Sequence, residues 1–541
     1  MSRLGVTLPA AAVAVILIGV AAAPARAQGV EGVWRIEATD DQGRPTAGLL
    51  RLLGAGPDLT YERHARPDLG APVAVERGVA RVAGGELLTA ESATPGLAGA
   101  LTSPPAAPGG APATWAGRYR LPAALGTGAV AEGERVLGAR RAPERLVRVD
   151  PAVAGNDVRL LIDGQAFAAL RDDLASAGRS VDLQVFNWVD DATGRSLAGL
   201  LGRRAGAGVD VRCLVDARSK TITRLVYGRA ARDFTHGLDE DLRRAGAEVV
   251  VQHGAAEGLR GSLTNLGRAV TGGLGRLVGR PPAPRESRGW KAHDHRKITV
   301  IDGVTGYIGG QNIAASYETG AWHDAQVRVQ GPAVDALAGL FQDRWAAAGG
   351  RRPAPTPPRR AWAGDLPVEV VGSIPGLPDP ILARLLGEVR RARREVCLEM
   401  AFLGHQESID ALQAAARRGV RVVVILPDDD ETPDKITREA FRWVQNEVVR
   451  SGVELYKLRG RMLHAKLGTF DGALATIGSH NMSGSSLAES NVFIPDARFA
   501  REMNARLFAV DIPASERVEV ERLTLGRRLT SFGARALRAL F

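Results

Sequence analysis

One stretch of the sequence occurs twice, and this duplication constrains the fold more than any other feature. The first copy starts at His295 and reads HRKITVIDGVTGYIGGQN, and the second starts at His464 and reads HAKLGTFDGALATIGSHN. The matched positions are His295, Lys297, Asp302, Gly309, Gly310 and Asn312 in the first copy and His464, Lys466, Asp471, Gly478, Ser479 and Asn481 in the second. Two copies with all of these positions in register predict two similar halves that build one site together.

The alternation of polar and apolar residues around each Lys predicts a strand, in which residues two positions apart lie on one face. His295 and Lys297 therefore point the same way, and a second strand with a small-residue turn brings Asn312 back beside them. The second copy predicts the same arrangement. Two His, two Lys and two Asn, with free backbone N–H groups at the small residues, form a site suited to a phosphodiester. The small residues expected to contact substrate are Gly309, Gly310, Gly478 and Ser479.

Both stretches resemble the duplicated HKD signature of the phospholipase D superfamily, over roughly residues 150–515. The resemblance implies an α/β fold of two duplicated phospholipase D-like α/β/α sandwich lobes with the active site between them. It also implies a phosphohistidine intermediate with no cofactor and no metal ion. By analogy His295 is the nucleophile and His464 the acid/base, but the nearly symmetric sequence leaves the reverse order open. Since one chain carries both motifs, a monomer is sufficient for catalysis.

The sequence predicts a division of the 541 residues into five segments. They are a signal peptide over 1–27, a small β-rich domain over 28–148, a first lobe over 149–350, a linker over 351–365 and a second lobe over 366–541. Short apolar runs between Gly, Pro and Asp predict an all-β sandwich or barrel for the β-rich domain. It is either a structural appendage or a docking module. In both lobes, strands that alternate with helical patterns predict βαβ units and a mostly parallel sheet.

The first residues have the pattern of an export signal. Arg3 precedes an apolar run, and Ala25-Arg26-Ala27 supplies a small-x-small cleavage site. We expect a mature chain that starts near Gln28 and is periplasmic or secreted. An uncleaved anchor is the alternative, because the apolar run is almost long enough to span a bilayer.

The net charge of +10 favours anionic partners, although a GC-rich genome would also enrich Arg. Two stretches combine Leu at helical spacing with interleaved Arg, one near 262–290 in the first lobe and one over 523–541. Each is either an ordinary helix packed on the core or a basic amphipathic helix on an anionic membrane or over the active-site mouth.

Acidic residues downstream of each motif are candidates to orient the two His side chains. The family resemblance suggests Glu489 for His464 and Asp324 for His295, with Glu318 as a rival of Asp324. Asp302 and Asp471 are interpreted as structural residues of a β-turn. We expect no metal ligands. The run His293-Asp294-His295 could suggest a metal site, but the place of His295 in the repeat explains it better. Both cysteines, Cys213 and Cys397, lie in apolar runs that predict buried thiols, with a disulfide as the alternative.

The substrate is predicted by resemblance. The region from Asn312 to Trp345 resembles bacterial cardiolipin synthases, whereas Ser483 and Ser485 stand where those enzymes carry Asp and Arg. We therefore expect a phospholipase D or phosphatidyltransferase acting on glycerophospholipids, with peripheral contact to an anionic membrane. A secreted nuclease is the alternative, and a non-catalytic lipid-binding protein is a lesser one, since such a protein needs no paired His and Lys.

Overall fold

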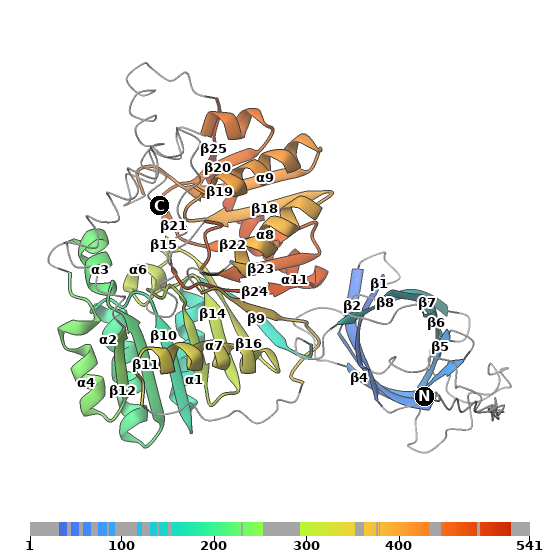
Figure 1. Ribbon diagram of the computed structural model, residues 1–541, viewed down its shortest axis with the longest axis horizontal. Coiled ribbons are helices and arrows are strands. Elements are labelled where there is room, and N and C mark those ends of the chain that lie inside the picture. The colour runs from blue at the N-terminus through green and yellow to red at the C-terminus, as the bar shows by residue number, and fades with distance from the viewer. Residues whose placement is uncertain are drawn as a thin grey trace, which may run out of the picture.

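The computed structural model describes the two lobes and a set of strands that precede them (Figure 1). The described residues are 154–520, apart from 229–230, 253–292, 352–361, 375–376, 378, 432–444 and 484–486, together with eight strands between 32 and 149 and Leu121. The predicted signal peptide, the basic Leu-rich insertion and the basic C-terminus lie outside the described residues. None of the helices within these ranges is long and apolar enough to cross a membrane.

Eight antiparallel strands in the N-terminal part of the chain close into a barrel. They are β1 (Gly32–Thr39), β2 (Pro45–Leu53), β3 (Asp58–Arg66), β4 (Ala74–Ala83), β5 (Glu86–Glu91), β6 (Ala116–Arg120), β7 (Val130–Leu137) and β8 (Arg140–Val149). Each strand pairs with the next, and β8 returns to pair with β1. Alternate residues such as Trp34 and Ile36 are buried, because side chains two positions apart fill the interior.

A seven-stranded sheet forms the centre of the first lobe, in the order β12-β11-β10-β13-β14-β16-β9. Its strands are β9 (Asp157–Ile162), β10 (Ser180–Val185), β11 (Asp210–Asp216), β12 (Glu248–Gln252), β13 (Ile298–Ile301), β14 (Thr305–Gly309) and β16 (Ala325–Gln330). Only β10, β11 and β12 run parallel, and the remaining pairs are antiparallel. The prediction of a mostly parallel sheet was therefore wrong.

Tight hairpins explain this difference, because a parallel pair needs a long crossover whereas β13 and β14 are joined by a short turn. Asp302 and Gly303 both adopt positive φ in that turn, and Asp471 and Gly472 do the same in the second lobe. The Asp-Gly pair is a strong hairpin signal, and it sits inside the repeated stretch.

The second lobe repeats this topology in an eight-stranded sheet, in the order β17-β24-β23-β22-β18-β19-β20-β25. Its strands are β17 (Glu369–Gly372), β18 (Glu395–Met400), β19 (Arg421–Pro427), β20 (Glu454–Leu458), β22 (Lys466–Phe470), β23 (Leu474–Gly478), β24 (Ser490–Ile494) and β25 (Ser515–Arg517). Read from β20 to β17, the order matches β12 to β9 strand for strand, with β25 added at the edge. The duplicated α/β lobes are thus confirmed.

Helices cover both sheets. In the first lobe they are α1 (Gly164–Ser176), α2 (Ala192–Gly206), α3 (Ser219–Tyr227), α4 (Leu238–Arg244), α6 (Ala315–Glu318) and α7 (Ala333–Ala347). In the second they are α8 (Pro380–Arg391), α9 (Gln406–Arg417), α11 (Ala497–Met503), a π-helical turn (Asn504–Phe508) and α12 (Ala509–Asp511). Asp379 and Asp496 cap the first turns of α8 and α11 through their carboxylates.

The two lobes share one hydrophobic core. Buried side chains of β9, β13, β16 and α7 from the first lobe belong to the same cluster as side chains of β22, β23, β24 and α11 from the second. Each lobe also has its own outer core under α1 and α2 or under α8 and α9. In Figure 1 the two sheets accordingly lie side by side, and the barrel stands to one side of them.

The cysteines and the repeated aspartates behave as predicted. Cys213 and Cys397 are buried free thiols in different sheets, and burial raises the pKa of each to about 12. The carboxylate of Asp302 accepts the backbone N–H groups of residues 178–180 at 2.7–2.9 Å, just where β10 begins. Asp471 accepts those of residues 393–395 at 2.8–3.0 Å before β18. Each Asp therefore ties its hairpin to the neighbouring strand.

Candidate active site

Both histidines of the repeat lie where the lobes meet, and each takes its carboxylate from the other lobe. Nδ1 of His295 lies 2.9 Å from Oε2 of Glu489, and Nδ1 of His464 lies 2.7 Å from Oδ2 of Asp324. The sequence identified both carboxylates, but it paired each with the histidine of its own lobe. That pairing was wrong, and the two partners are exchanged.

Short backbone bridges between the lobes cause the exchange. Asp294 forms a parallel bridge with Ala488, and the N–H of His295 donates to the carbonyl of Ala488 at 2.8 Å. This places Glu489 beside His295.

The matching bridge joins β15 (Trp322–His323) to β21 (Met462–Leu463), and there the N–H of His464 donates to the carbonyl of His323 at 2.8 Å. Asp324 follows β15 directly and so reaches His464. Nothing in the linear spacing of the motifs reveals either bridge.

Six side chains of the predicted site are brought together and are all buried: His295, Lys297, Asn312, His464, Lys466 and Asn481. The ammonium groups of Lys297 and Lys466 each donate to the carbonyl of the His two positions earlier. Nζ of Lys466 also lies 3.1 Å from Nδ1 of His464. His, Lys and carboxylate thus form one compact charged group in each half.

The asparagines complete the two halves differently. Oδ1 of Asn312 accepts the N–H of Asn187 at 3.1 Å, and its amide nitrogen donates to the hydroxyl of Tyr317 at 3.1 Å. Oδ1 of Asn481 has no hydrogen-bond partner among the described residues. Asn312 is therefore held by its own lobe, while Asn481 keeps its oxygen open.

The small residues of the motif contact the chain itself. A Cβ on Gly310 would lie 2.3 Å from Oδ1 of Asp324, and one on Gly478 would lie 2.1 Å from Oδ1 of Asn491. A Cβ on Gly309 would meet the carbonyl of Ala325 at 2.4 Å. These glycines leave room for the neighbouring strand and for the carboxylate of Asp324. Their contact with substrate stays a prediction.

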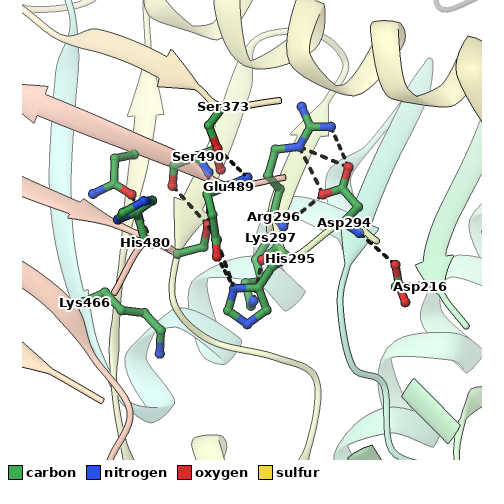
Figure 2. A network of polar contacts seen from close by, with 12 residues as sticks. Asp216, Asp294, His295, Arg296, Lys297, Ser373, Lys466, His480, Glu489 and Ser490 are labelled. Atoms are coloured by element: carbon green, nitrogen blue, oxygen red, sulfur yellow. Dashed lines mark hydrogen bonds and ion pairs between the residues drawn. The ribbon is translucent and has the colours of Figure 1, made fainter. Parts of the chain in front are cut away.

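Ser479 differs from its counterpart Gly310 because it has a hydroxyl. That hydroxyl donates to Oε2 of Glu489, and it accepts the N–H of Ser490 at 3.0 Å. The N–H of Glu489 donates to Oγ of Ser373 at 3.1 Å. Figure 2 shows Glu489 beside Ser373 and Ser490, with its carboxylate directed at His295.

Charges and burial set unequal pKa values at the two carboxylates. Burial alone would raise the pKa of Glu489, but His295, followed by His480 and Lys297, lowers it to about 2. Burial raises the pKa of Asp324 to about 6, although Lys466 opposes this rise. Glu489 is therefore fully ionised at neutral pH.

The basic groups also have shifted pKa values. Burial is the main cause of a lowered pKa at both histidines, with Glu489 opposing it at His295 and Lys466 adding to it at His464. The pKa of His464 falls well below its usual range. Burial lowers the pKa of Lys297 to about 7 and that of Lys466 to about 8. Such shifts at buried, facing groups are typical of catalytic sites.

Aromatic side chains line both histidines. Phe186 meets His295 edge-on at 4.7 Å between ring centroids, and the ammonium of Lys297 lies 5.2 Å from the centroid of Phe186. Tyr317 and Trp322 each lie 5.4 Å from His464. Sequence analysis missed Phe186 and Asn187, because neither has a counterpart in the repeat. Tyr317 and Trp322 lie within the region, from Asn312 to Trp345, that resembles cardiolipin synthases.

The remaining candidates take separate partners. His293 pairs with Asp216 at 2.7 Å, and Asp294 pairs with Arg296 at 2.5 Å, so the run His293-Asp294-His295 does not converge on one point. Glu318, the rival of Asp324, forms an ion pair with Arg171 at 2.5 Å and contacts neither histidine of the repeat.

The comparisons with known proteins agree with this geometry. A family model described as "Cardiolipin synthase, PLD-like domain" matches residues 385–509. The cardiolipin synthase A of Pseudomonas aeruginosa (strain LESB58) is 30% identical over 425 residues, which cover 75% of this chain and 78% of that protein. The cardiolipin synthase B of Escherichia coli (strain K12) is 28% identical over 375 residues, covering 65% of this chain and 80% of that protein.

Among solved structures, the phosphatidylserine synthase of Haemophilus influenzae Rd KW20 is similar, with a TM-score of 0.47 and 11% identity. The match covers 70% of this chain and 92% of that one. A likeness this distant carries no functional argument.

Proposed function

Because the chain belongs to the cardiolipin synthase family of the phospholipase D superfamily, we propose that it transfers the phosphatidyl group of a glycerophospholipid to an alcohol or to water. The observation that carries the proposal is the pair of buried His–carboxylate contacts exchanged between the lobes. Each histidine has Nδ1 facing a carboxylate, which orients Nε2 for chemistry. At His464, Nζ of Lys466 also lies 3.2 Å from Nε2.

In the first displacement, Nε2 of His295 attacks phosphorus and the bond from phosphorus to the head-group oxygen breaks. His464 must be protonated when substrate is bound, and it gives that proton to the departing alkoxide, so that a free alcohol leaves. The product is a phosphatidyl group bonded to His295. That imidazole now carries positive charge, and the ionised Glu489 stabilises it. This charge is our reason to assign the nucleophile to His295.

The second displacement reverses the first. His464 takes the proton from the hydroxyl of the acceptor, whose oxygen attacks phosphorus. The bond from phosphorus to Nε2 breaks, and its electron pair returns to His295. With the hydroxyl of a second glycerophospholipid as acceptor the product is cardiolipin-like, and with water it is phosphatidic acid.

Lys297 and Lys466 supply the positive charge for the phosphodiester oxygens, and the amides of Asn312 and Asn481 supply donors. Preorganised donors of this kind stabilise charge that increases in the transition state. The reaction as written needs no metal ion at phosphorus.

The proposal also includes export and contact with a membrane. The apolar run and the Ala25-Arg26-Ala27 site support export to the periplasm or beyond, and the basic Leu-rich stretches support peripheral binding to anionic lipid. Vesicle flotation of the full chain with and without residues 523–541 tests the membrane contact.

The decisive experiment incubates the purified full chain with labelled phosphatidylglycerol, with and without a primary alcohol. We expect labelled cardiolipin or phosphatidic acid, and a phosphatidyl-alcohol when the alcohol is present. His295→Ala should lower the rate by about ten-thousandfold. His236→Ala is the matched control, because His236 is exposed and pairs with Asp233, apart from the histidines of the repeat. No lipid turnover, with parallel cleavage of DNA, would replace this proposal with the nuclease alternative.

A further inference from the structure

A second group of ionisable side chains is buried between the lobes, apart from the histidines of the repeat. His323 comes from β15, Glu399 from β18 and Asp511 from α12, and each is at most 1% exposed. Each offers one nitrogen or oxygen, and these atoms all lie within 4.8 Å of one another. The group therefore combines one side chain of the first lobe with two of the second.

The imidazole of His323 is oriented from one side. Its Nδ1 lies 2.9 Å from Oδ1 of Asp163, while its Nε2 faces Oδ2 of Asp511 at 3.1 Å and Oε2 of Glu399 at 3.8 Å. Histidines that bind metal ions nearly always donate their other ring N–H to a carboxylate or carbonyl in this way.

Asp511 is oriented in the same manner. Its Oδ2 faces His323, and its other oxygen, Oδ1, accepts a hydrogen bond from Arg461 at 2.8 Å. Arg461 also donates to Oδ2 of Asp163 at 3.0 Å, so one guanidinium holds both supporting carboxylates. The atoms that face the centre of the group, Nε2 of His323 and Oδ2 of Asp511, contact each other at 3.1 Å.

Glu399 provides an independent observation. It is completely buried, and neither of its carboxylate oxygens has a hydrogen-bond partner among the described residues. A buried carboxylate without such a partner is strongly disfavoured, and a buried one is normally paired or bound to a metal ion. Its nearest basic atom is Nε2 of His323, which already faces Asp511.

We propose that His323, Glu399 and Asp511 bind a divalent cation, Zn²⁺ by the chemistry of the donors, with water as the fourth ligand. One imidazole nitrogen and two carboxylate oxygens suit zinc, whose ligand atoms in a tetrahedral site lie about 3.4 Å apart. The separations of 3.1 and 3.8 Å from Nε2 bracket that value.

The cation joins the lobes and takes no part at phosphorus. His323 and Asp324 are neighbours, but His323 contacts Asp511 whereas Asp324 contacts His464. By binding His323, zinc would therefore fix the backbone next to Asp324, on the side away from His464. The inference is independent of the proposed reaction, because metal content and thermal stability are measured without substrate.

The test compares the full chain, purified without added metal or chelator, with two variants. Glu399→Gln removes a ligand at nearly constant volume. Asp365→Asn is the control, since Asp365 is a buried carboxylate that pairs with Arg498 at 2.9 Å outside the group. We expect about one zinc per chain by elemental analysis in the unaltered protein and in the control, and none in Glu399→Gln.

Stability gives the second readout. Removal of zinc with a chelator should lower the Tm of the unaltered chain and of the control by several degrees, and added Zn²⁺ should restore it. Glu399→Gln should respond to neither treatment. Asp163→Asn keeps all three ligands and should weaken zinc binding by about 10–100-fold.

One result would overturn the inference. If the unaltered chain contains no zinc, gains no Tm from Zn²⁺, Mn²⁺ or Mg²⁺, and matches Glu399→Gln, then Glu399 is protonated and donates to Asp511. The group is in that case a network of charges and protons without a metal ion.

Discussion

The two copies of the motif match in sequence, yet their histidines occupy different surroundings. His295 faces a carboxylate with a pKa of about 2, and His464 faces one with a pKa of about 6. The hydrogen bonds of the two carboxylates differ as well, because Ser479 donates a hydroxyl to Glu489 whereas Gly310, its counterpart, has no side chain to offer Asp324. A duplicated motif can therefore supply two unlike catalytic groups.

The largest expected effect separates the roles of the two histidines. His295→Ala and His464→Ala should each lower turnover by about ten-thousandfold. Only His464→Ala should still form a phosphatidyl-enzyme from a substrate with an acidic leaving group, since that departure needs no proton. Acid quenching after incubation with labelled substrate measures the adduct. An adduct in His295→Ala and none in His464→Ala would reverse the two assignments.

The carboxylates should differ next. Glu489→Gln should lower kcat by about 10³–10⁴-fold, because a neutral amide neither fixes the tautomer of His295 nor stabilises its positive charge. Asp324→Asn should cost less, about 10–100-fold, because Asp324 holds its charge more weakly. Steady-state rates on phosphatidylglycerol measure both. Equal losses would mean that the electrostatic difference between the halves has no role in catalysis.

The pH profile of kcat/KM tests the roles of the histidines and lysines of the two halves. On the acid side the rate should fall as His295 gains a proton, below the usual pKa of a histidine because burial lowers it. On the basic side it should fall first as His464, whose pKa burial and Lys466 lower, loses the proton that it gives to the leaving group. It should fall further as Lys297, with a pKa of about 7, and Lys466, with a pKa of about 8, lose their charge. Lys297 is faced by Glu489, Lys466, Asp324 and Asp294.

Lys297→Arg tests the basic limb directly. A guanidinium stays charged throughout this range, so the loss of rate near the pKa of Lys297, about 7, should disappear, and the loss near the pKa of Lys466, about 8, should remain. A basic limb that stays in place would assign it to another group.

The smallest expected effect is a similar loss of stability when the matched aspartates of the two hairpins are replaced. Asp302→Asn and Asp471→Asn should each lower Tm by about 1–3 °C, because Asn tolerates the positive φ but weakens three hydrogen bonds to backbone N–H groups. Neighbours lower the pKa of both carboxyls against the effect of burial, so their stabilisation is lost as pH falls through the folded-state pKa. Melting scans at neutral and acidic pH measure it. A clear inequality would show that the hairpins support the lobes unequally.

Much of this fold could be predicted from local patterns. The strand with His and Lys on one face, the hairpin at Asp302 and the duplicated lobes all follow from spacing within about 20 residues. The exchange of Asp324 and Glu489 could not be predicted, because it depends on bridges between segments far apart in the sequence. The group at His323, Glu399 and Asp511 was missed for the same reason, since no motif links these positions. The prediction of a mostly parallel sheet was wrong because it extended the βαβ pattern to strands that are joined by hairpins.

The crossed partnership of histidines and carboxylates has a consequence for how such a chain changes over generations. A substitution at Asp324 changes the surroundings of His464, and one at Glu489 changes those of His295. Substitutions at these positions in one lobe therefore affect the other lobe. Among descendants of the ancestral duplication, position 324 should vary together with 464 and position 489 with 295. The two repeats are thus expected to evolve together at these four positions, although they differ at many others.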